Sequence, residues 1–438
     1  MFSSPLVVCF ALFLSLPVVY LFSSSILPSK AAAPVPSSPL ILPSAAASDE
    51  LDDLSLFRRA ATPAGRPPKC NRLGLKKPRP KIAFLFLTNS DLTFAPLWER
   101  FFKGHDHLYN IYIHADPAMK SSNTNSSSRT STASSGKRVR LTGSRKHSNH
   151  LLLSWPARSI WDSGYRSPGG VFDGRFIVSK RTERATPALI AAARRLLASA
   201  LLDDPANFYF ALVSQHCIPL HSFSFMYKTL FGNSLEAVQA YINPSKFPSF
   251  IEILSDEPNL YERYTARGED VMLPEVPFEQ FRVGSQFFML TRRHSLLAIK
   301  DRKLWRKFRL PCLNKESCYP EEHYFPTLLS MADPKGCGHY TLTRVNWTGS
   351  FDGHPHLYGP DEISPDLVYQ LRESDLGYSH FFARKFSPES LRPLMDMADD
   401  IIFGTEISSS GDSVSEWTIL FIYFISIVVP TWMMIDKN

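Results

Sequence analysis

A buried-strand pattern near residue 81 limits the folds that are open to this chain. Residues 81–88 form a continuous apolar run, which is typical of a strand covered on both faces of a parallel sheet. A helical segment follows at 96–102, and a second strand is predicted at 109–116, ending on Asp116. Strand, helix and strand in this order open an α/β nucleotide-binding fold, whose ligands bind at the carboxyl ends of the strands. The sequence therefore predicts the α/β class, with a mostly parallel central sheet.

Further patterns continue this domain to residue 404. A strong helix is predicted over 186–202, with Thr186 as its cap and a proline at its first position. Buried strands are predicted over 208–214 and 287–291. The remaining expected elements are helices at about 292–308, 321–331, 364–374 and 387–403, and a strand at 340–347.

The N-terminal segment predicts attachment to a membrane. Residues 5–22 form an almost unbroken apolar run, and no charged side chain precedes Lys30. As a helix this run would measure about 27 Å, close to a hydrocarbon core of about 30 Å. A cleaved signal peptide would have a basic start and a shorter apolar stretch. We therefore favour an uncleaved signal anchor at 5–27 behind a cytosolic tip of residues 1–4, and either interpretation sends the body into the secretory pathway.

Three further segments depart from the pattern of a packed domain. Residues 28–80 are rich in Ser, Pro and Ala and predict a stalk, because they cannot bury enough apolar area to become ordered. Residues 117–170 are dominated by Ser, Thr, Asn and basic residues, and we expect a disordered insertion there. Residues 405–438 form an atypical tail, whose uncharged stretch 417–435 is a second transmembrane candidate.

Charge and cysteine content narrow the range of partners. The chain has 48 Lys and Arg against 41 Asp and Glu, an excess that suits a nucleic acid, an acidic membrane or a phosphorylated small molecule. Entry into the secretory pathway argues against a nucleic acid. Cys312, Cys318 and Cys337 lie close together without a C-x-x-C motif, which favours a disulfide over a zinc site and leaves the pairing open. Sequons at Asn125 and Asn346 permit N-glycosylation.

Two adjacent carboxylates are the first candidates for chemistry. Pro320 stands at a predicted helix start and is followed by Glu321 and Glu322, beside the positive end of the helix dipole. That position lowers the pKa of a carboxyl group and keeps it ionised, as a general base requires. Ordinary helix-start composition explains the same pair. Glycosidase chemistry is disfavoured, because neighbours on a helix point about 100° apart and cannot face each other across a bond.

A diphosphate site without a metal is the second prediction. No Asp-x-Asp motif occurs anywhere in the chain, although many nucleotide-sugar transferases bind a divalent metal through one. Basic side chains would then have to neutralise a bound diphosphate, and the candidates are Arg372, Arg384 and Lys385. We expect no metal and no other cofactor.

Aromatic and small residues supply candidate contacts for an acceptor. Trp347 ends an apolar strand and could stack on the face of a sugar, although a core position is the more common outcome for a Trp. Gly284 and Ser285 precede the strand at 287–291. Glycine there permits close approach of the backbone to a ligand, although most glycines before strands form turns.

Together these segments resemble the plant branch of the core-2/I-branching β-1,6-N-acetylglucosaminyltransferases. The similar motifs begin at Lys81, Ala95, Ile111, Cys217, Gly284, Tyr319 and Phe382. The resemblance covers 81–116 and 171–404, and the insertion and the tail are foreign to it. It implies a single-pass type II Golgi membrane protein whose luminal domain is a GT-A-like, inverting and metal-independent transferase. The implied substrates are a UDP-sugar donor, with N-acetylglucosamine as the transferred sugar in animal members, and a glycan or glycoprotein acceptor.

The resemblance also gives roles to individual residues. The catalytic base of the family falls on Glu322, and its diphosphate-binding lysine falls on Lys385, with Arg372 or its rival Arg384 as the partner arginine. The other candidates are Asp116 and Thr88 for the donor, and Trp347, Gly284 and Ser285 for the acceptor. The alternative function is a non-catalytic sugar-binding or scaffold protein of the Golgi on a transferase fold.

Overall fold

The computed structural model describes residues 44–62, 79–118, 170–350 and 353–404. Within these stretches no helix is both long and apolar enough to cross a membrane. The expected anchor at 5–27, the apolar stretch at 417–435 and the sequon at Asn125 lie outside the described residues, as does nearly all of the expected insertion.

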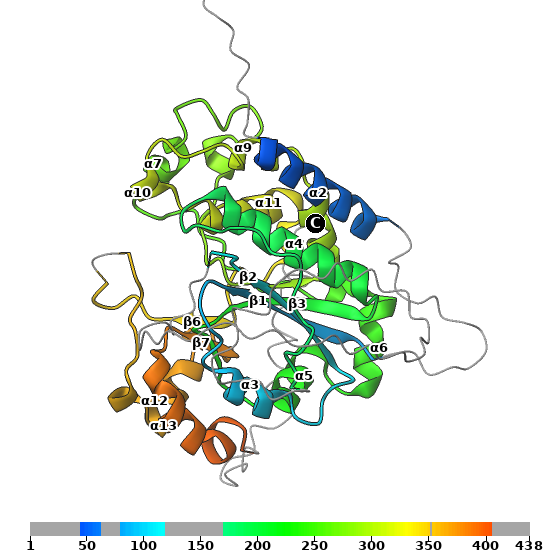
Figure 1. The fold of residues 1–438 in the computed structure, drawn as a ribbon, viewed down its shortest axis with the longest axis vertical. Coiled ribbons are helices and arrows are strands. Elements are labelled where there is room, and N and C mark those ends of the chain that lie inside the picture. The colour runs from blue at the N-terminus through cyan, green and yellow to red at the C-terminus, as the bar shows by residue number, and fades with distance from the viewer. Residues whose placement is uncertain (1–43, 63–78, 119–169, 351–352, 405–438) are drawn as a thin grey trace, which may run out of the picture. The chain divides into compact units, whose positions relative to one another are not determined.

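A four-stranded sheet with the order β2-β1-β3-β5 lies at the centre of the domain (Figure 1). Strand β1 (Lys81–Thr88) pairs in parallel with β2 (Tyr109–Ala115) and with β3 (Asn207–Ser214), and β5 (Met289–Thr291) runs antiparallel to β3. All residues of β3, and all but the first of β1, are buried. The predicted α/β class with a mostly parallel sheet is therefore confirmed.

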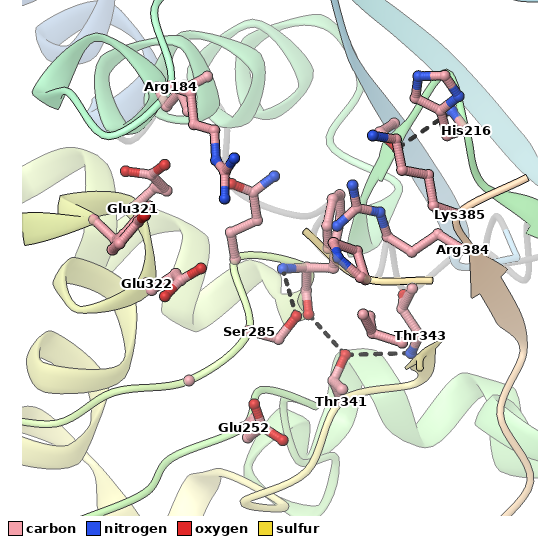
Figure 2. A pocket seen from close by; sticks show the side chains of 18 of the residues that line it. Arg184, His216, Glu252, Ser285, Glu321, Glu322, Thr341, Thr343, Arg384 and Lys385 are labelled. Carbon is pink, nitrogen blue, oxygen red and sulfur yellow. Dashed lines mark hydrogen bonds between the residues drawn. The ribbon is translucent and has the colours of Figure 1, made fainter. Parts of the chain in front are cut away.

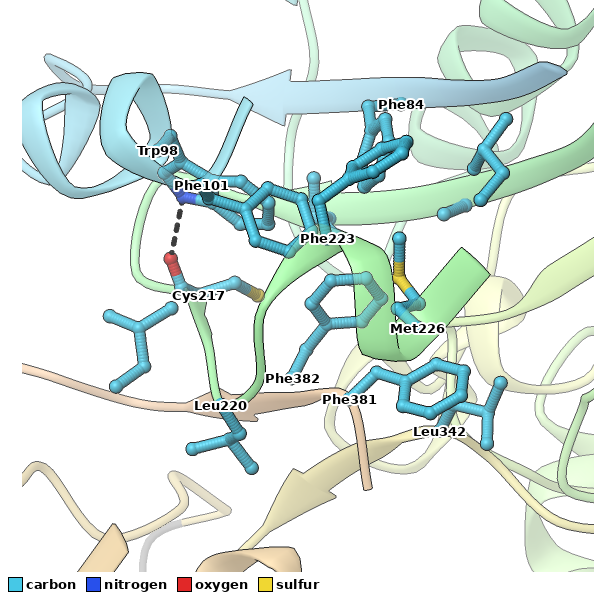
Figure 3. Close-up of a cluster of buried hydrophobic side chains, with 14 of the residues drawn as sticks. Phe84, Trp98, Phe101, Cys217, Leu220, Phe223, Met226, Leu342, Phe381 and Phe382 are labelled. Atoms are coloured by element: carbon cyan, nitrogen blue, oxygen red, sulfur yellow. Dashed lines mark hydrogen bonds between the residues drawn. The ribbon is translucent and has the colours of Figure 1, made fainter. Parts of the chain in front are cut away.

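Side chains of β1 alternate between two apolar layers that cover the faces of the sheet. Phe84 packs in the layer of α3 (Ala95–Phe102), and its ring centroid lies 5.9 Å from that of Trp98 (Figure 3). Leu85 packs in the layer of α4 (Pro187–Asp203) on the opposite face. This coverage of both faces is why the strand needs an unbroken apolar run.

A second, three-stranded sheet brings late segments of the chain beside the central one. Its order is β4-β7-β6, in which β7 (Phe382–Arg384) pairs with β4 (Ile218–Pro219) and with β6 (Thr343–Val345). The indole nitrogen of Trp98 donates to the carbonyl oxygen of Cys217 at 3.1 Å (Figure 3). This contact ties the start of β4 to α3, so β7 is held against the central core.

The remaining α-helices complete the two apolar layers and the periphery. They are α5 (Phe223–Phe231), α6 (Ser234–Ile242), α7 (Leu260–Thr265), α8 (Arg292–Lys300), α9 (Trp305–Phe308), α10 (Lys315–Cys318), α11 (Tyr324–Ala332), α12 (Pro365–Arg372) and α13 (Leu391–Asp396). The single helix expected at 292–308 is divided into α8 and α9, because the carboxylate of Asp301 accepts backbone hydrogen bonds from Lys303, Leu304 and Trp305 and starts a new turn.

Part of the expected stalk is packed against the domain. Helix α2 (Ser44–Ala61) lies within 28–80, and its residue Phe57 is only 7% exposed. Asp53 on the same helix accepts from Nε and Nη2 of Arg195 at 2.6 and 2.7 Å, and Lys180 Nζ lies 3.1 Å from its carboxylate. The prediction of an unpacked stalk is therefore wrong for this helix from Asp53 onward. The local sequence does not reveal the packing, because the residues that Asp53 contacts lie more than a hundred positions along the chain.

A disulfide shapes the approach to the candidate carboxylates. Cys312 and Cys318 are joined, and Cys337 remains a buried thiol. The prediction of a disulfide among these three cysteines is confirmed, with the pairing now assigned. The bond closes the loop that leads directly into Tyr319 and the following turn.

Candidate functional site

A pocket of about 750 Å³ opens at the carboxyl ends of β1 and β3 (Figure 2). Thr88 and Ser214, the last residues of these strands, line it. Its walls come from the segment before α4, the loop before β5, the turn before α11, and strands β6 and β7. This is the edge at which parallel α/β sheets bind ligands.

The two adjacent glutamates lie in a 3₁₀ turn that precedes a helix. The turn spans Pro320–Glu322, and α11 begins only at Tyr324. Burial raises the pKa of both Glu321 and Glu322. The expected lowering by the helix dipole is therefore wrong in sign, because the carboxylates stand ahead of the helix and their desolvation dominates.

Glu322 has the environment of a general base. Its Oε2 accepts from Nη1 of Arg263 on α7 at 2.8 Å, and this contact opposes the rise in the pKa of Glu322 that burial causes. Its Oε1 has no hydrogen-bond partner among the described residues. One carboxylate oxygen is thus held in place, while the other can accept the proton of a hydroxyl group in the pocket.

Glu321 also lines the pocket, but it is buried, whereas Glu322 is partly exposed. Only 6% of Glu321 is exposed, and its Oε1 accepts from the backbone N–H of Ala185 at 3.0 Å. Its Oε2 is buried and has no hydrogen-bond partner among the described residues. Burial raises the pKa of Glu321 to about 7. This side chain fastens the segment before α4 to the turn.

Replacing Glu321 with Gln is expected to remove a pH dependence of stability. Folding raises the pKa of Glu321 from 4.5 to about 7. Below the pKa of the unfolded chain the carboxyl group is protonated in both states, so it does not lower the free energy of unfolding. Between the two pKa values ionisation increasingly favours the unfolded state, and above the folded pKa the free energy of unfolding has fallen by up to roughly 3 kcal/mol. Gln cannot ionise but keeps an oxygen for Ala185. Denaturant unfolding should show that the variant gains stability relative to the unsubstituted protein between pH 5 and pH 8; an unchanged difference would contradict this.

Basic residues face the pocket from β7 and the residue after it. Arg384 and Lys385 both line the pocket, and Cζ of Arg384 lies 4.5 Å from the ring centroid of Phe287 (Figure 2). The Nε of Arg384 is buried without a hydrogen-bond partner among the described residues. The pair therefore presents two cations to one end of the cavity, where a diphosphate would find charge compensation.

Arg372, the other candidate partner arginine, does not line the pocket. Its Nε and Nη2 donate to the carbonyl oxygens of Leu220 and Ile401, each at 2.7 Å. The guanidinium group thus binds the end of α12 to neighbouring backbone. Of the two candidate partner arginines, only Arg384 lines the cavity. The structure therefore favours Arg384, and not the preferred Arg372, as the arginine that could contact a donor.

The two candidate donor contacts at strand ends have different surroundings. Thr88 lines the pocket, and its buried hydroxyl has no hydrogen-bond partner among the described residues. Asp116 does not line the pocket: its carboxylate accepts from the N–H and hydroxyl of Thr182 at 2.7 and 2.6 Å, and from the N–H of Ala118 at 2.7 Å. The expectation of direct contact by Asp116 is therefore corrected, since its oxygens hold the segment before α4 instead.

The predicted acceptor residues all line the pocket. Trp347 is 52% exposed, so it stands at the surface of the cavity and the commoner core position does not apply. A Cβ on Gly284 would overlap the carbonyl oxygen of Glu252, and the N–H of Gly284 donates to the carbonyl oxygen of Glu322 at 2.9 Å. Glycine at 284 thus permits close packing of backbone beside Glu322. Ser285 lies next to it.

Six charged residues of the pocket were not identified from the sequence. They are Glu183, Arg184, Glu252, Glu257, Arg263 and Arg344. Burial raises the pKa of Glu252, and Glu322 and Glu257 raise it further, against a backbone hydrogen bond from Ser285. No local pattern marks these residues, because each becomes part of the site only through contacts with segments remote in sequence.

Comparison with known proteins shows the family of this chain. The model of the Core-2/I-Branching enzyme family matches residues 82–372. A rice (Oryza sativa subsp. japonica) protein named Glycosyltransferase BC10 is 24% identical over 365 residues, which cover 73% of this chain and 76% of the rice protein. The family match spans most of the domain and includes the central sheet, the glutamate turn and the pocket segment before α4. The chain therefore belongs to the Core-2/I-branching enzyme family of glycosyltransferases.

Proposed function

We propose that this protein is an inverting, GT-A-like glycosyltransferase that moves a sugar from a UDP-sugar to a hydroxyl group of a glycan or glycoprotein. By family resemblance the transferred sugar is N-acetylglucosamine. The observation that carries this proposal is the placement of Glu322, Arg384 and Lys385 around one pocket at the carboxyl ends of the central strands. A base and a diphosphate-binding pair are the two groups that such a reaction requires.

The proposed reaction is a single displacement. Glu322 accepts the proton of the acceptor hydroxyl while its oxygen bonds to the anomeric carbon of the donor. The bond between that carbon and the diphosphate oxygen breaks, and its electron pair leaves with UDP. Arg384 and Lys385 stabilise the charge that develops on the leaving diphosphate. Attack from the face opposite the leaving group inverts the anomeric configuration.

Binding of the donor tests this function directly. UDP-N-acetylglucosamine should raise the melting temperature of the full chain in detergent, whereas CMP- and GDP-sugars should not, since a ligand that binds only the folded state stabilises it. Stabilisation by free glycans with no response to any UDP-sugar would favour the alternative of a non-catalytic sugar-binding or scaffold protein. A parallel screen of UDP-xylose and UDP-glucuronic acid identifies the donor sugar.

Metal chelation is expected to leave the activity intact. The chain has no Asp-x-Asp motif, and the cations of Arg384 and Lys385 are available for the diphosphate. Initial rates should therefore agree with and without EDTA. Loss of activity in EDTA that manganese restores would reject the metal-independent mechanism.

The proposed location is the Golgi membrane, with the transferase domain in the lumen. The uncharged apolar run at 5–27 supports a single-pass type II anchor. The domain in intact Golgi vesicles should then resist added protease until detergent opens the membrane. Digestion without detergent would contradict this topology.

A further inference from the structure

A firmly held loop carries an additional cation into the pocket. Residues 182–186 are fastened at two points: Thr182 by Asp116, through hydrogen bonds of 2.7 and 2.6 Å, and Ala185 by Glu321, at 3.0 Å. Ala185 has a φ of 57°, a left-handed conformation that is uncommon outside glycine and persists where the surroundings enforce it. The fold therefore fixes the backbone of the two residues between these points, Glu183 and Arg184.

Of these two residues Arg184 carries the positive charge, and its side chain lines the pocket (Figure 2). Nη2 donates to the carbonyl oxygen of Gly353 at 2.6 Å, and Nη1 lies 3.0 Å from the ring nitrogens of His354. Cζ lies 5.4 Å from the ring centroid of Tyr319. No carboxylate of the described residues forms an ion pair with Arg184 within 4.0 Å. Its positive charge is thus directed at the cavity. Glu321 and Glu322 are within its electrostatic range, because Arg184 opposes the rise in the pKa of both, but neither forms an ion pair with it.

The charge of Arg184 acts on both ends of the pocket. Burial raises the pKa of Glu322, and Arg263 and Arg184 oppose that rise. Burial lowers the pKa of Arg384, and Arg184 lowers it further. Arg184 is therefore within electrostatic range of the proposed base and of the proposed diphosphate-binding pair. Figure 2 shows its guanidinium group pointing from the side of Glu321 toward the space between these two groups.

We propose that Arg184 binds an anionic group of the nucleotide-sugar donor, either the diphosphate or a carboxylate on the transferred sugar. This inference rests on the proposed glycosyltransferase function. A guanidinium group presents paired N–H donors that match the oxygens of phosphate and carboxylate alike. Arg384 and Lys385 approach the same cavity from β7, so Arg184 would complete a cationic enclosure around the donor from the opposite wall.

Calorimetric titration of the full chain in detergent tests this assignment. UDP, UDP-glucose and UDP-glucuronic acid are titrated into the unsubstituted protein, Arg184→Gln and Arg181→Gln. Arg181 is the matched control, because it is exposed on the same segment and does not line the pocket. We expect Arg184→Gln to weaken binding by about 10- to 100-fold, and Arg181→Gln to change it by less than about twofold. Reduced affinity for all three ligands would show that Arg184 binds the diphosphate. Reduced affinity for UDP-glucuronic acid alone would show that it binds the carboxylate of the sugar.

The failures of the two hypotheses are distinguishable. If the unsubstituted protein binds none of the three ligands, the proposed function is rejected and this inference falls with it. If it binds them, and Arg184→Gln binds all three as Arg181→Gln does, the inference alone is rejected. If Arg184→Gln does not fold, Arg184→Lys is titrated in its place. Lysine keeps the positive charge but lacks the paired N–H donors of the guanidinium group. This variant should still weaken the assigned ligand, and unchanged affinity in Arg184→Lys would then reject the inference.

Discussion

Glu322→Gln is expected to reduce turnover by about 10²- to 10⁴-fold, the usual consequence of losing a general base. Gln retains an oxygen for the hydrogen bond from Arg263, which Glu322 now receives at 2.8 Å, but it cannot take the proton of the acceptor hydroxyl. Affinity for the donor should change little, because this carboxylate is assigned to the acceptor side. Steady-state kinetics together with titration of the UDP-sugar separates the two effects.

Glu321→Gln is the matched control for this substitution. The two glutamates share one turn and both line the pocket. Glu321 is buried and holds the N–H of Ala185, whereas Glu322 has an oxygen available to a hydroxyl group in the pocket. The control should therefore keep near-normal turnover. Equal damage from both substitutions, or normal turnover in Glu322→Gln, would show that the base lies elsewhere.

Lys385→Ala is expected to weaken UDP-sugar binding by about 10- to 100-fold, the equivalent of one lost charge-assisted hydrogen bond. The reason is that Lys385 lines the pocket beside Arg384, at the end assigned to the diphosphate. Affinity for uridine, which lacks phosphate, should be unchanged. Titration with UDP and with uridine measures the difference.

Arg372→Gln distinguishes a pocket cation from a structural one. Arg372 donates to the backbone of Leu220 and Ile401 outside the pocket. Its replacement should lower the melting temperature and leave UDP affinity unchanged once the protein is folded. If Arg372→Gln weakens UDP binding as much as Lys385→Ala does, the donor site has been placed at the wrong cations.

The sequence by itself determined the framework of this protein. The apolar runs predicted β1, β2 and β3, and the cap and proline at 186–187 predicted the start of α4, where the side chain of Thr186 accepts from the N–H of Ala188. These signals are local: an unbroken apolar run records a strand covered on both faces, and a cap lies next to the helix that it starts. The sequence also carries the motifs by which the chain resembles its family, and the family match over residues 82–372 confirms that resemblance.

The tertiary structure decided how the charged residues are used. Arg384 faces the pocket and Arg372 does not, although both lie near the end of the same domain. Asp116 holds Thr182, and Arg263 reaches Glu322 from 59 positions earlier in the chain. The reason is physical: an ion pair and a desolvation penalty depend on which surfaces fold together, and the sequence near a residue does not contain that information. The raised pKa of Glu322, opposite to the effect of a helix start, follows from the same burial.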